Sequence, residues 1–205
     1  MNVVLAILFL AGLFFWLQFR AKRRAIGREA ELKGISSLER TLFNLQVGDV
    51  VQYLQRDWIL ETVYSYQQDD FEWFEYLLRD GTDVAWLVVV EDDWLEVSWL
   101  IPVDEHELQI RIPPPTVIRH RDVIYQLKES GKANYSTVGR VNNQAGSCQF
   151  FDYRSPDGQV LSLELYGASA EEMGDLDVCI GAAIDPRLLS LLPGDGRSVY
   201  AGAPC

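Results

Sequence analysis

The chain has 205 residues and a formal net charge of −12 at pH 7. From residue 34 onward it carries 12 basic and 28 acidic residues, and such a surface repels phosphates, which excludes a nucleic-acid-binding function. The three cysteines lie far apart without a Cys-x-x-Cys pair, so the sequence predicts no disulfide framework and favours a reducing compartment.

The first predicted element is a transmembrane helix with a basic collar, residues 1–24. Residues 3–17 carry no polar side chain, and as a helix residues 2–19 would span about 27 Å, enough to cross a hydrocarbon core. Basic residues follow this run but do not precede it, which favours a retained anchor over a cleaved signal peptide.

The collar also predicts the orientation of the chain, because basic residues stay on the cytoplasmic side of a membrane. The membrane-orienting residues are Arg20, Lys22, Arg23, Arg24 and Arg28. The sequence therefore predicts a single-pass membrane protein with its N-terminus outside and its C-terminal domain in the cytoplasm.

Residues 25–44 are predicted to form a helical linker, including a short helix that begins near Ser36. Beyond it, runs rich in β-branched and aromatic residues alternate with turn signals, which is typical of strands. The expected strands of a first β lobe, residues 45–112, are 49–54, 57–66, 71–79, 84–91, 94–101 and 107–112.

Three consecutive prolines, Pro113 to Pro115, predict a stiff linker over residues 113–117. A second β lobe is expected over residues 118–193, with a short helix opening at Asp185-Pro186, and residues 194–205 are expected to be a loose tail. The expected strands of this lobe are 122–127, 134–142, 147–154, 159–166 and 176–183.

The two halves resemble each other. FEWFEYLLRDG at residues 71–81 and CQFFDYRSPDG at residues 148–158 share aromatic, acidic, Tyr and closing Asp-Gly positions, and Asp49-Val50-Val51 has a counterpart in Asp122-Val123-Ile124. A repeat explains this pattern, and chance similarity between two hairpins is the alternative. The predicted fold is therefore mainly β, with one N-terminal transmembrane helix followed by two similar small antiparallel β barrel or roll lobes.

Residues 45–99 resemble a known family. The Val47-Gly48-Asp49 opening, the Trp58 strand, Trp73-x-Glu75-Tyr76, the Trp86-Leu87 pair and the following Glu-Asp-Asp turn are similar to the domain of unknown function 4178. The resemblance implies a bacterial domain without an established activity and transfers no catalytic residue. With an N-terminal anchor it implies a cyanobacterial-type member in a thylakoid or plasma membrane, beside photosynthetic complexes.

No catalytic or metal-binding motif is evident. His106 and His120 lie 14 residues apart without further ligands nearby, and no nucleotide-binding or nucleophile-elbow motif occurs. Cys148 and Cys179 lie in or beside apolar runs and are expected to be buried thiols. The sequence therefore predicts no enzyme, no cofactor and no metal.

The candidate partner-binding residues are acids and one aromatic at two predicted turns, Asp69, Asp70, Glu91, Asp92, Asp93 and Trp94. Two strands separate the turns, so both are expected at the same end of a meander. Glu75 and Asp152 alternate with aromatics and are expected on a solvent-facing side. The alternative is that these two acids converge in a cleft.

These features predict a membrane-tethered cytoplasmic protein-interaction or assembly module, an auxiliary factor for a membrane complex such as a photosynthetic one. Its acidic face would bind basic loops of membrane proteins. The alternative function is a β-barrel small-ligand binder, or an enzyme that uses carboxylates.

Overall fold

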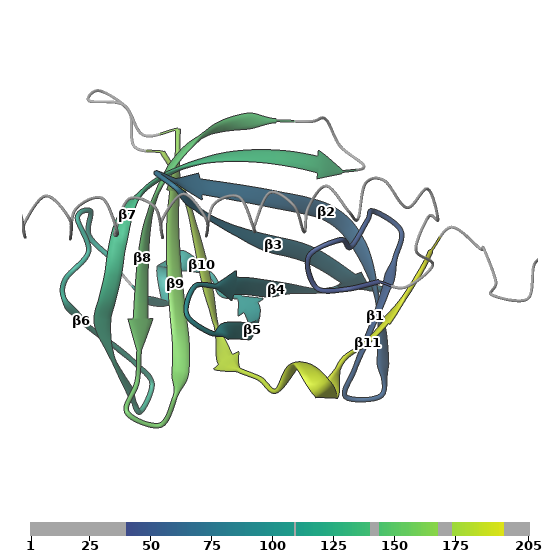
Figure 1. Cartoon of the computed structure of the whole chain (residues 1–205). Coiled ribbons are helices and arrows are strands. Elements are labelled where there is room, and N and C mark those ends of the chain that lie inside the picture. Colours follow the sequence, from purple (N-terminus) through teal and green to yellow (C-terminus); the bar gives the residue numbers. More distant parts are fainter. Residues whose placement is uncertain (1–39, 109, 140–143, 168–173, 195–205) are drawn as a thin grey trace, which may run out of the picture. The chain divides into compact units, whose positions relative to one another are not determined.

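The computed structural model describes residues 40–108, 110–139, 144–167 and 174–194, which form an almost entirely β structure (Figure 1). The first half contains β1 (Val50–Tyr53), β2 (Arg56–Gln68), β3 (Phe71–Asp80), β4 (Asp83–Glu91), β5 (Leu95–Pro102) and the helical turn α2 (Glu105–Leu108). The second contains β6 (Val117–His120), β7 (Val123–Gly139), β8 (Ala145–Arg154), β9 (Gln159–Tyr166), β10 (Asp175–Ala183), the 3-10 turn η1 (Pro186–Leu188) and β11 (Ser190–Leu192).

The eleven strands of the described part form one antiparallel sheet in the order β11-β1-β2-β3-β4-β5-β10-β9-β8-β7-β6. Because β2 also pairs with β7, the eight strands from β2 to β7 in that order close into a ring. The prediction of a mainly β fold is confirmed. The expectation of two separate lobes is wrong, because the halves share two seams, β2 with β7 and β5 with β10, and each seam pairs strand edges that a separate lobe would leave open.

Close backbone approach marks the seam between β5 and β10. Gly181 of β10 pairs with Leu100, and a Cβ at Gly181 would lie 1.9 Å from the carbonyl oxygen of Trp99. Only glycine fits this position without moving a strand, so this residue helps the ring to close.

The resemblance between the two halves reappears in the topology. Each half is a five-stranded meander in which a short strand is followed by a long one and three of intermediate length. The matching segments 71–81 and 148–158 form β3 and β8 with the turns after them, where Gly81 and Gly158 both have positive φ angles. The other proposed match does not hold, because Asp49 precedes β1 whereas Asp122 precedes β7, the second strand of its half.

Several strand boundaries differ from the expected ones. Residues 123–127 and 134–139 of two expected strands belong to one long strand, β7, and residues 140–142 lie outside the described residues. Gly131 lies within β7, where a side chain would meet the Phe150 ring at 2.9 Å. The expected strand 107–112 begins with the last turn of α2 and continues without strand pairing in its described residues. The expected helix after Asp185 is only η1, followed by β11, which pairs with β1.

Apolar side chains cover the outer face of the ring in two clusters. Tyr76 and Leu87 belong to a cluster that the loop before β1, β1 and the segment around β11 cover. Tyr153 and Leu163 belong to a second cluster beside the segment between β5 and β6. In that segment the carbonyl oxygen of Pro115 accepts a hydrogen bond from the Tyr153 hydroxyl at 2.8 Å, so the proline linker is fixed to β8.

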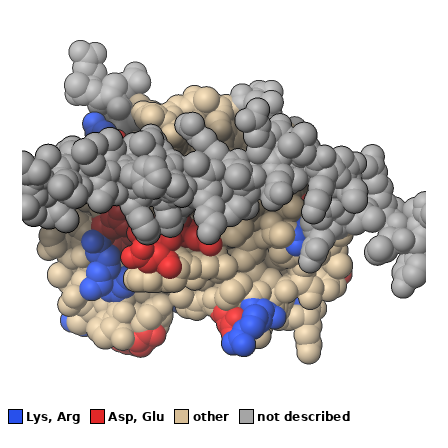
Figure 2. Space-filling view, in the orientation of Figure 1, with Lys and Arg blue, Asp and Glu red and all other residues tan. Residues whose placement is uncertain are grey.

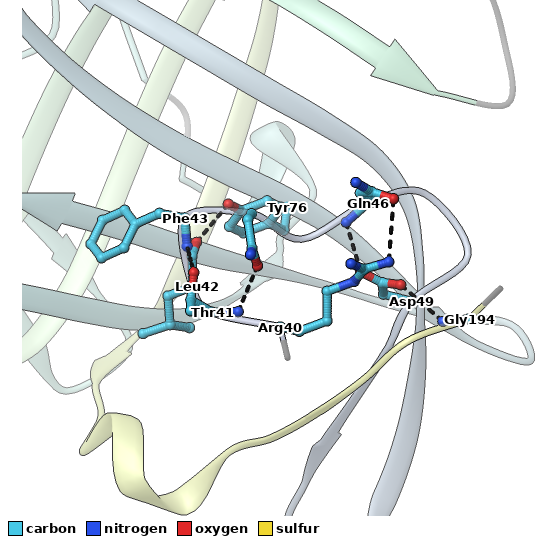
Figure 3. A network of polar contacts seen from close by, with 9 residues as sticks. Arg40, Thr41, Leu42, Phe43, Gln46, Asp49, Tyr76 and Gly194 are labelled. Carbon is cyan, nitrogen blue, oxygen red and sulfur yellow. Dashed lines mark hydrogen bonds and ion pairs between the residues drawn. The ribbon is translucent and has the colours of Figure 1, made fainter. Parts of the chain in front are cut away.

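A buried ion pair holds the first described residues against the end of the sheet (Figure 3). The Asp49 carboxylate accepts hydrogen bonds from Arg40 Nε at 2.5 Å, Gln46 N at 2.8 Å and Gly194 N at 2.9 Å. Residues 40–44, expected to end a helical linker, instead form turns in which the Leu42 carbonyl oxygen accepts a hydrogen bond from the Tyr76 hydroxyl. The two ends of the described chain are thus joined through one carboxylate.

The predicted transmembrane helix, its basic collar and most of the linker lie outside the described residues. Among the residues that the structure does describe, none forms a helix with the length and apolar character to cross a membrane. Gly194 is the only described residue of the predicted tail.

Candidate functional site

The inner face of the ring carries the candidate site. Alternation along β3 places Tyr76 and Leu78 in the outer cluster and Trp73 and Glu75 on the opposite face. Side chains from strands that do not neighbour each other meet there, because the Trp73 ring on β3 lies 5.5 Å from the Phe150 ring on β8. The face that bears Trp73 and Glu75 is therefore the interior of the ring.

Two glutamates are buried in this interior. Glu75 on β3 accepts a hydrogen bond from Trp73 Nε1 at 3.1 Å. Glu164 on β9 accepts hydrogen bonds from the hydroxyls of Tyr66 on β2, at 2.9 Å, and of Tyr166. The two tyrosine hydroxyls also contact each other at 2.5 Å. Aromatic donors from three strands therefore fix both carboxyl groups inside the ring.

A third carboxyl group and an ion pair lie further along the same face. Asp152 on β8 accepts a hydrogen bond from the Ser162 hydroxyl at 2.8 Å. Two residues further along β8, Arg154 forms an ion pair with Glu96 of β5 on another side of the ring. Arg154 and Glu96 lie nearer the ends of their strands than Glu75 and Glu164 do, beside the turns that follow β8 and precede β5.

These groups surround a cavity of about 80 Å³. Its acidic lining residues are Glu75, Glu96, Glu129, Asp152 and Glu164, its basic lining residue is Arg154, its hydroxyls come from Ser98 and Ser162, and its aromatic wall from Phe71, Trp73 and Phe150. A single water needs roughly 10 to 15 Å³ by this kind of measure, so the cavity has room for several waters or a small organic molecule. Exposed Glu129 and half-exposed Glu96 and Arg154 place its open side near the turn ends of their strands.

Three of the carboxyl groups that line the cavity, those of Glu75, Asp152 and Glu164, have raised pKa values. Burial raises the pKa of Glu164 to about 7, although the tyrosine hydroxyls that bond to it oppose the shift. Burial and the charge of Glu164 raise the pKa of Glu75, and burial raises the pKa of Asp152. Groups that are this perturbed in a cavity mark a candidate functional site, because a fold rarely keeps buried carboxyls that only lower its stability.

The chemistry of this lining favours a cation. When ionised, the five carboxyl groups outnumber the one guanidinium in a space with an aromatic wall, which suits an ammonium group. Among the described residues no cluster of His, Cys, Asp and Glu has the geometry of a metal site. Burial raises the pKa of the Cys148 thiol to about 12 and also raises that of Cys179, so neither is an activated nucleophile.

The structure corrects the prediction for Glu75 and Asp152. Both were expected on a solvent-facing side, but Glu75 is buried, Asp152 is partly buried, and both line the cavity. The apolar clusters cover the outer face of the sheet instead, so the polar side chains of these strands turn inward. Glu164, Tyr66 and Tyr166 were not singled out, although an acid flanked by leucines in Leu163-Glu164-Leu165 was a signal for a buried carboxyl group.

The predicted partner-binding residues are exposed at two turns. Asp69 and Asp70 join β2 to β3, and the turn from Glu91 to Trp94 joins β4 to β5, so both turns lie at the same end of the meander. Phe71 and Val90, which adjoin these turns, line the cavity, so the acidic turns lie beside it. Exposed acids there would raise the local concentration of cations.

The acids do not form a continuous surface on the side drawn in Figure 2. Acidic and basic side chains lie next to one another on its described part, among wide areas of other residues. Among the described surface residues, Arg56 forms ion pairs with Asp80 and Asp83, so some of the acids are paired with a base. The membrane-orienting residues lie outside the described residues.

The comparisons with known proteins add a family. A family model with the description Domain of unknown function (DUF4178) matches residues 46–186, which include all strands of the ring. The resemblance inferred from residues 45–99 is therefore confirmed and extends through the second half. Neither the curated proteins nor the solved structures give a match.

Proposed function

The chain belongs to the family of the domain of unknown function DUF4178, a description that names no activity, and we propose that its ring binds a small organic ammonium ion. The observation that carries this proposal is the convergence of five carboxyl groups and one guanidinium on a cavity of about 80 Å³. These buried carboxyl groups ionise readily only beside a compensating positive charge, and the described lining supplies only Arg154, which already pairs with Glu96.

The aromatic wall supports an organic ion over a hydrated metal ion. Trp73 and Phe150 meet edge to face beside the carboxyl groups, and such rings attract ammonium groups through their π faces and pack against attached carbons. Tyr66 and Tyr166 both donate to the same carboxyl oxygen of Glu164, Oε2, so the site is largely formed before a ligand enters. Binding without chemical conversion is the simplest function of this arrangement.

We expect ethylammonium to bind the full-length chain, kept in a neutral detergent, in isothermal titration at pH 8. Changing both Glu75→Gln and Glu164→Gln should weaken this binding at least tenfold, because the carboxylate charges that attract the ion are lost while amide groups of similar shape remain. The matched control is Glu72→Gln, an exposed residue on the same strand that does not line the cavity and should leave binding unchanged. Absent binding, or equal loss in the control, would refute the proposal.

A second candidate function is the membrane-tethered interaction module predicted from the sequence. Trp94 favours it, because this large apolar side chain is 72% exposed beside the acidic residues Glu91, Asp92 and Asp93. A basic loop of a membrane protein would match both the charge and the aromatic side chain. In this proposal residues 1–24 anchor the chain, with the domain on the cytoplasmic side.

Changing Asp92→Lys together with Asp93→Lys is expected to reduce recovery of membrane partners several-fold, because like charges would then meet across the interface. The measurement is quantitative mass spectrometry of companions recovered with the tagged full-length chain in mild detergent. Asp122→Lys, at the exposed turn between β6 and β7, serves as the control. Equal recovery from all three chains would exclude this surface as the contact.

A further inference from the structure

Arg154 has a donor that its own neighbours leave unused. Its Nη2 group bonds to Glu96, but its Nη1 group is buried and has no hydrogen-bond partner in the described part of the chain. A guanidinium offers five N–H donors, and a buried donor without an acceptor is unfavourable. Because Arg154 lines the cavity, the missing acceptor is most simply supplied by a ligand.

The surroundings decide what kind of acceptor fits. Glu96, Glu129 and Asp152 line the same cavity as Arg154, so an anionic oxygen placed there would meet three acids. Glu96 already accepts a hydrogen bond from Nη2 and balances the charge of Arg154, so an anionic ligand would compete with Glu96 for the paired contact through which arginine usually holds a carboxylate or phosphate. A neutral hydroxyl oxygen needs only one N–H of the unpartnered Nη1 group and adds no negative charge.

The position of Arg154 also limits the length of the ligand. Arg154 and Asp152 are alternate residues of β8, so their side chains lie on the same face, with Cα atoms about 7 Å apart at the usual rise of a strand. Register places Asp152 opposite Ser162 and Phe150 opposite Glu164, so the carboxyl groups continue in one direction from Arg154. A ligand of a few atoms would reach from the guanidinium to the first of them.

We infer that the ligand is a small amino alcohol, with its ammonium group at the carboxyl groups of Asp152, Glu164 and Glu75 and its hydroxyl oxygen at Arg154 Nη1. This inference rests on the proposed function, because it assumes that an ammonium ion binds in the ring. The cavity of about 80 Å³ suits a molecule of this size. The same chemistry occurs in a free amino alcohol and in a phosphorylated headgroup, and the charges around Arg154 favour the free form.

The test compares 2-aminoethanol with ethylamine by isothermal titration into the full-length chain at pH 8. We expect 2-aminoethanol to bind about tenfold more tightly, the size expected for one hydrogen bond to a charged group. Arg154→Met should abolish this preference. Loss of the positive charge changes the affinity for both amines alike, so the ratio of the two affinities is the readout. Glycine and O-phosphoethanolamine, which carry anionic oxygens, should bind more weakly than 2-aminoethanol.

Each of the other outcomes would overturn either the amino alcohol inference or the proposed ammonium-binding function. Equal affinities for the two amines, or a preference that survives in Arg154→Met, would overturn the amino alcohol while leaving the ammonium site in place. Tighter binding of glycine or O-phosphoethanolamine would show that Arg154 receives an anionic group. Failure of every amine to bind would remove the proposed function itself. Near-ultraviolet circular dichroism checks that the variant is folded, and Arg154→Lys, which keeps the charge but not the Nη1 donor, should lose the preference as well.

Discussion

Changing Asp49→Ala is expected to lower the free energy of unfolding by about 3 to 5 kcal/mol, the range for removing one partner of a buried ion pair. The Asp49 side chain is 2% exposed and that of Arg40 is 7% exposed, so neither group regains water when its partner is lost. The substitution also leaves the backbone N–H groups of Gln46 and Gly194 without their acceptor. Equilibrium urea unfolding followed by tryptophan fluorescence measures the change.

Two further variants separate the network from the general effect of removing an acid. Asp70→Ala removes an exposed carboxylate from the turn after β2 and should leave the unfolding midpoint close to that of the parent chain. Combining Arg40→Ala with Asp49→Ala should cost much less than the sum of the single changes, because the second change removes the charge that the first leaves unpaired. Additive losses would contradict the view that these residues act as one unit.

The strands that local patterns define were predicted well. β1 to β5 and β8 to β10 lie close to the expected ranges, because aromatic and β-branched runs end at Asp-Gly turns and other turn signals. Gly81 and Gly158 have φ angles of 60° and 85°, the left-handed values that such turns require. Local sequence was sufficient where one turn joins two neighbouring strands.

Ring closure could not be predicted in the same way. The pairing of β2 with β7 joins Tyr66 to Tyr135, residues that no short-range pattern relates. The expected strands 122–127 and 134–142 left a gap at residues 128–133, whereas β7 continues through these residues, and Gly131 there leaves room for the Phe150 ring. A glycine in a strand pattern can mark either a break in the strand or a position where another group packs closely, and only the packing partner shows which.

The sequence identified two acids of the site, Glu75 and Asp152, but did not predict that they face the interior of the ring. Glu75 and Asp152 were recognised as alternating with aromatics, but alternation shows only that an acid and its neighbours occupy opposite faces. Which face meets water depends on what covers the sheet, and here β1, β11 and the segment before β6 cover the apolar one. The acids therefore came together inside the ring, the alternative that had been left open.

The stability of the domain is expected to fall as the pH rises from about 4.5 to 7. Burial raises the pKa of Glu164 to about 7, whereas an unfolded glutamate titrates near pH 4.3, so the folded chain binds more protons than the unfolded chain in this window. The free energy of unfolding therefore decreases with pH through this window, by about 4 kcal/mol in all for this residue alone.

The acids that face Glu164 act in the same direction, whereas the two tyrosine hydroxyls that bond to it oppose the shift in its pKa. These groups come from every strand packed against it and are Tyr66 (β2), Glu75 (β3), Asp152 (β8), Tyr166 (β9) and Asp177 (β10). Burial raises the pKa of each of the three acids among them, so each is better tolerated as a neutral group at low pH. Repulsion among the surface acids has the same sign, so the slope of the parent chain alone does not identify its source.

The variant Glu164→Gln isolates the contribution of the site. Its amide oxygen can still accept hydrogen bonds from the tyrosine hydroxyls, but the side chain no longer ionises. We expect it to be more stable than the parent chain at pH 8, similar at pH 4.5, and to show a shallower slope between them in urea unfolding. Glu72→Gln changes an exposed acid on β3 and should keep the parent slope. An unchanged slope in Glu164→Gln would mean that Glu164 ionises as freely as a surface residue.

Ligand binding should oppose the effect of burial on the same carboxyl groups, because it stabilises their ionised form. An ammonium ion in the ring favours the ionised carboxyl groups, so saturating ethylammonium should raise stability more at pH 8 than at pH 5 and flatten the slope of the parent chain. In Glu164→Gln the same addition should have a smaller effect. An equal increase in stability at both pH values would show that ligand binding does not depend on the ionisation of Glu164. The cost of keeping these acids buried at neutral pH is then the free energy that a cation can recover when it binds.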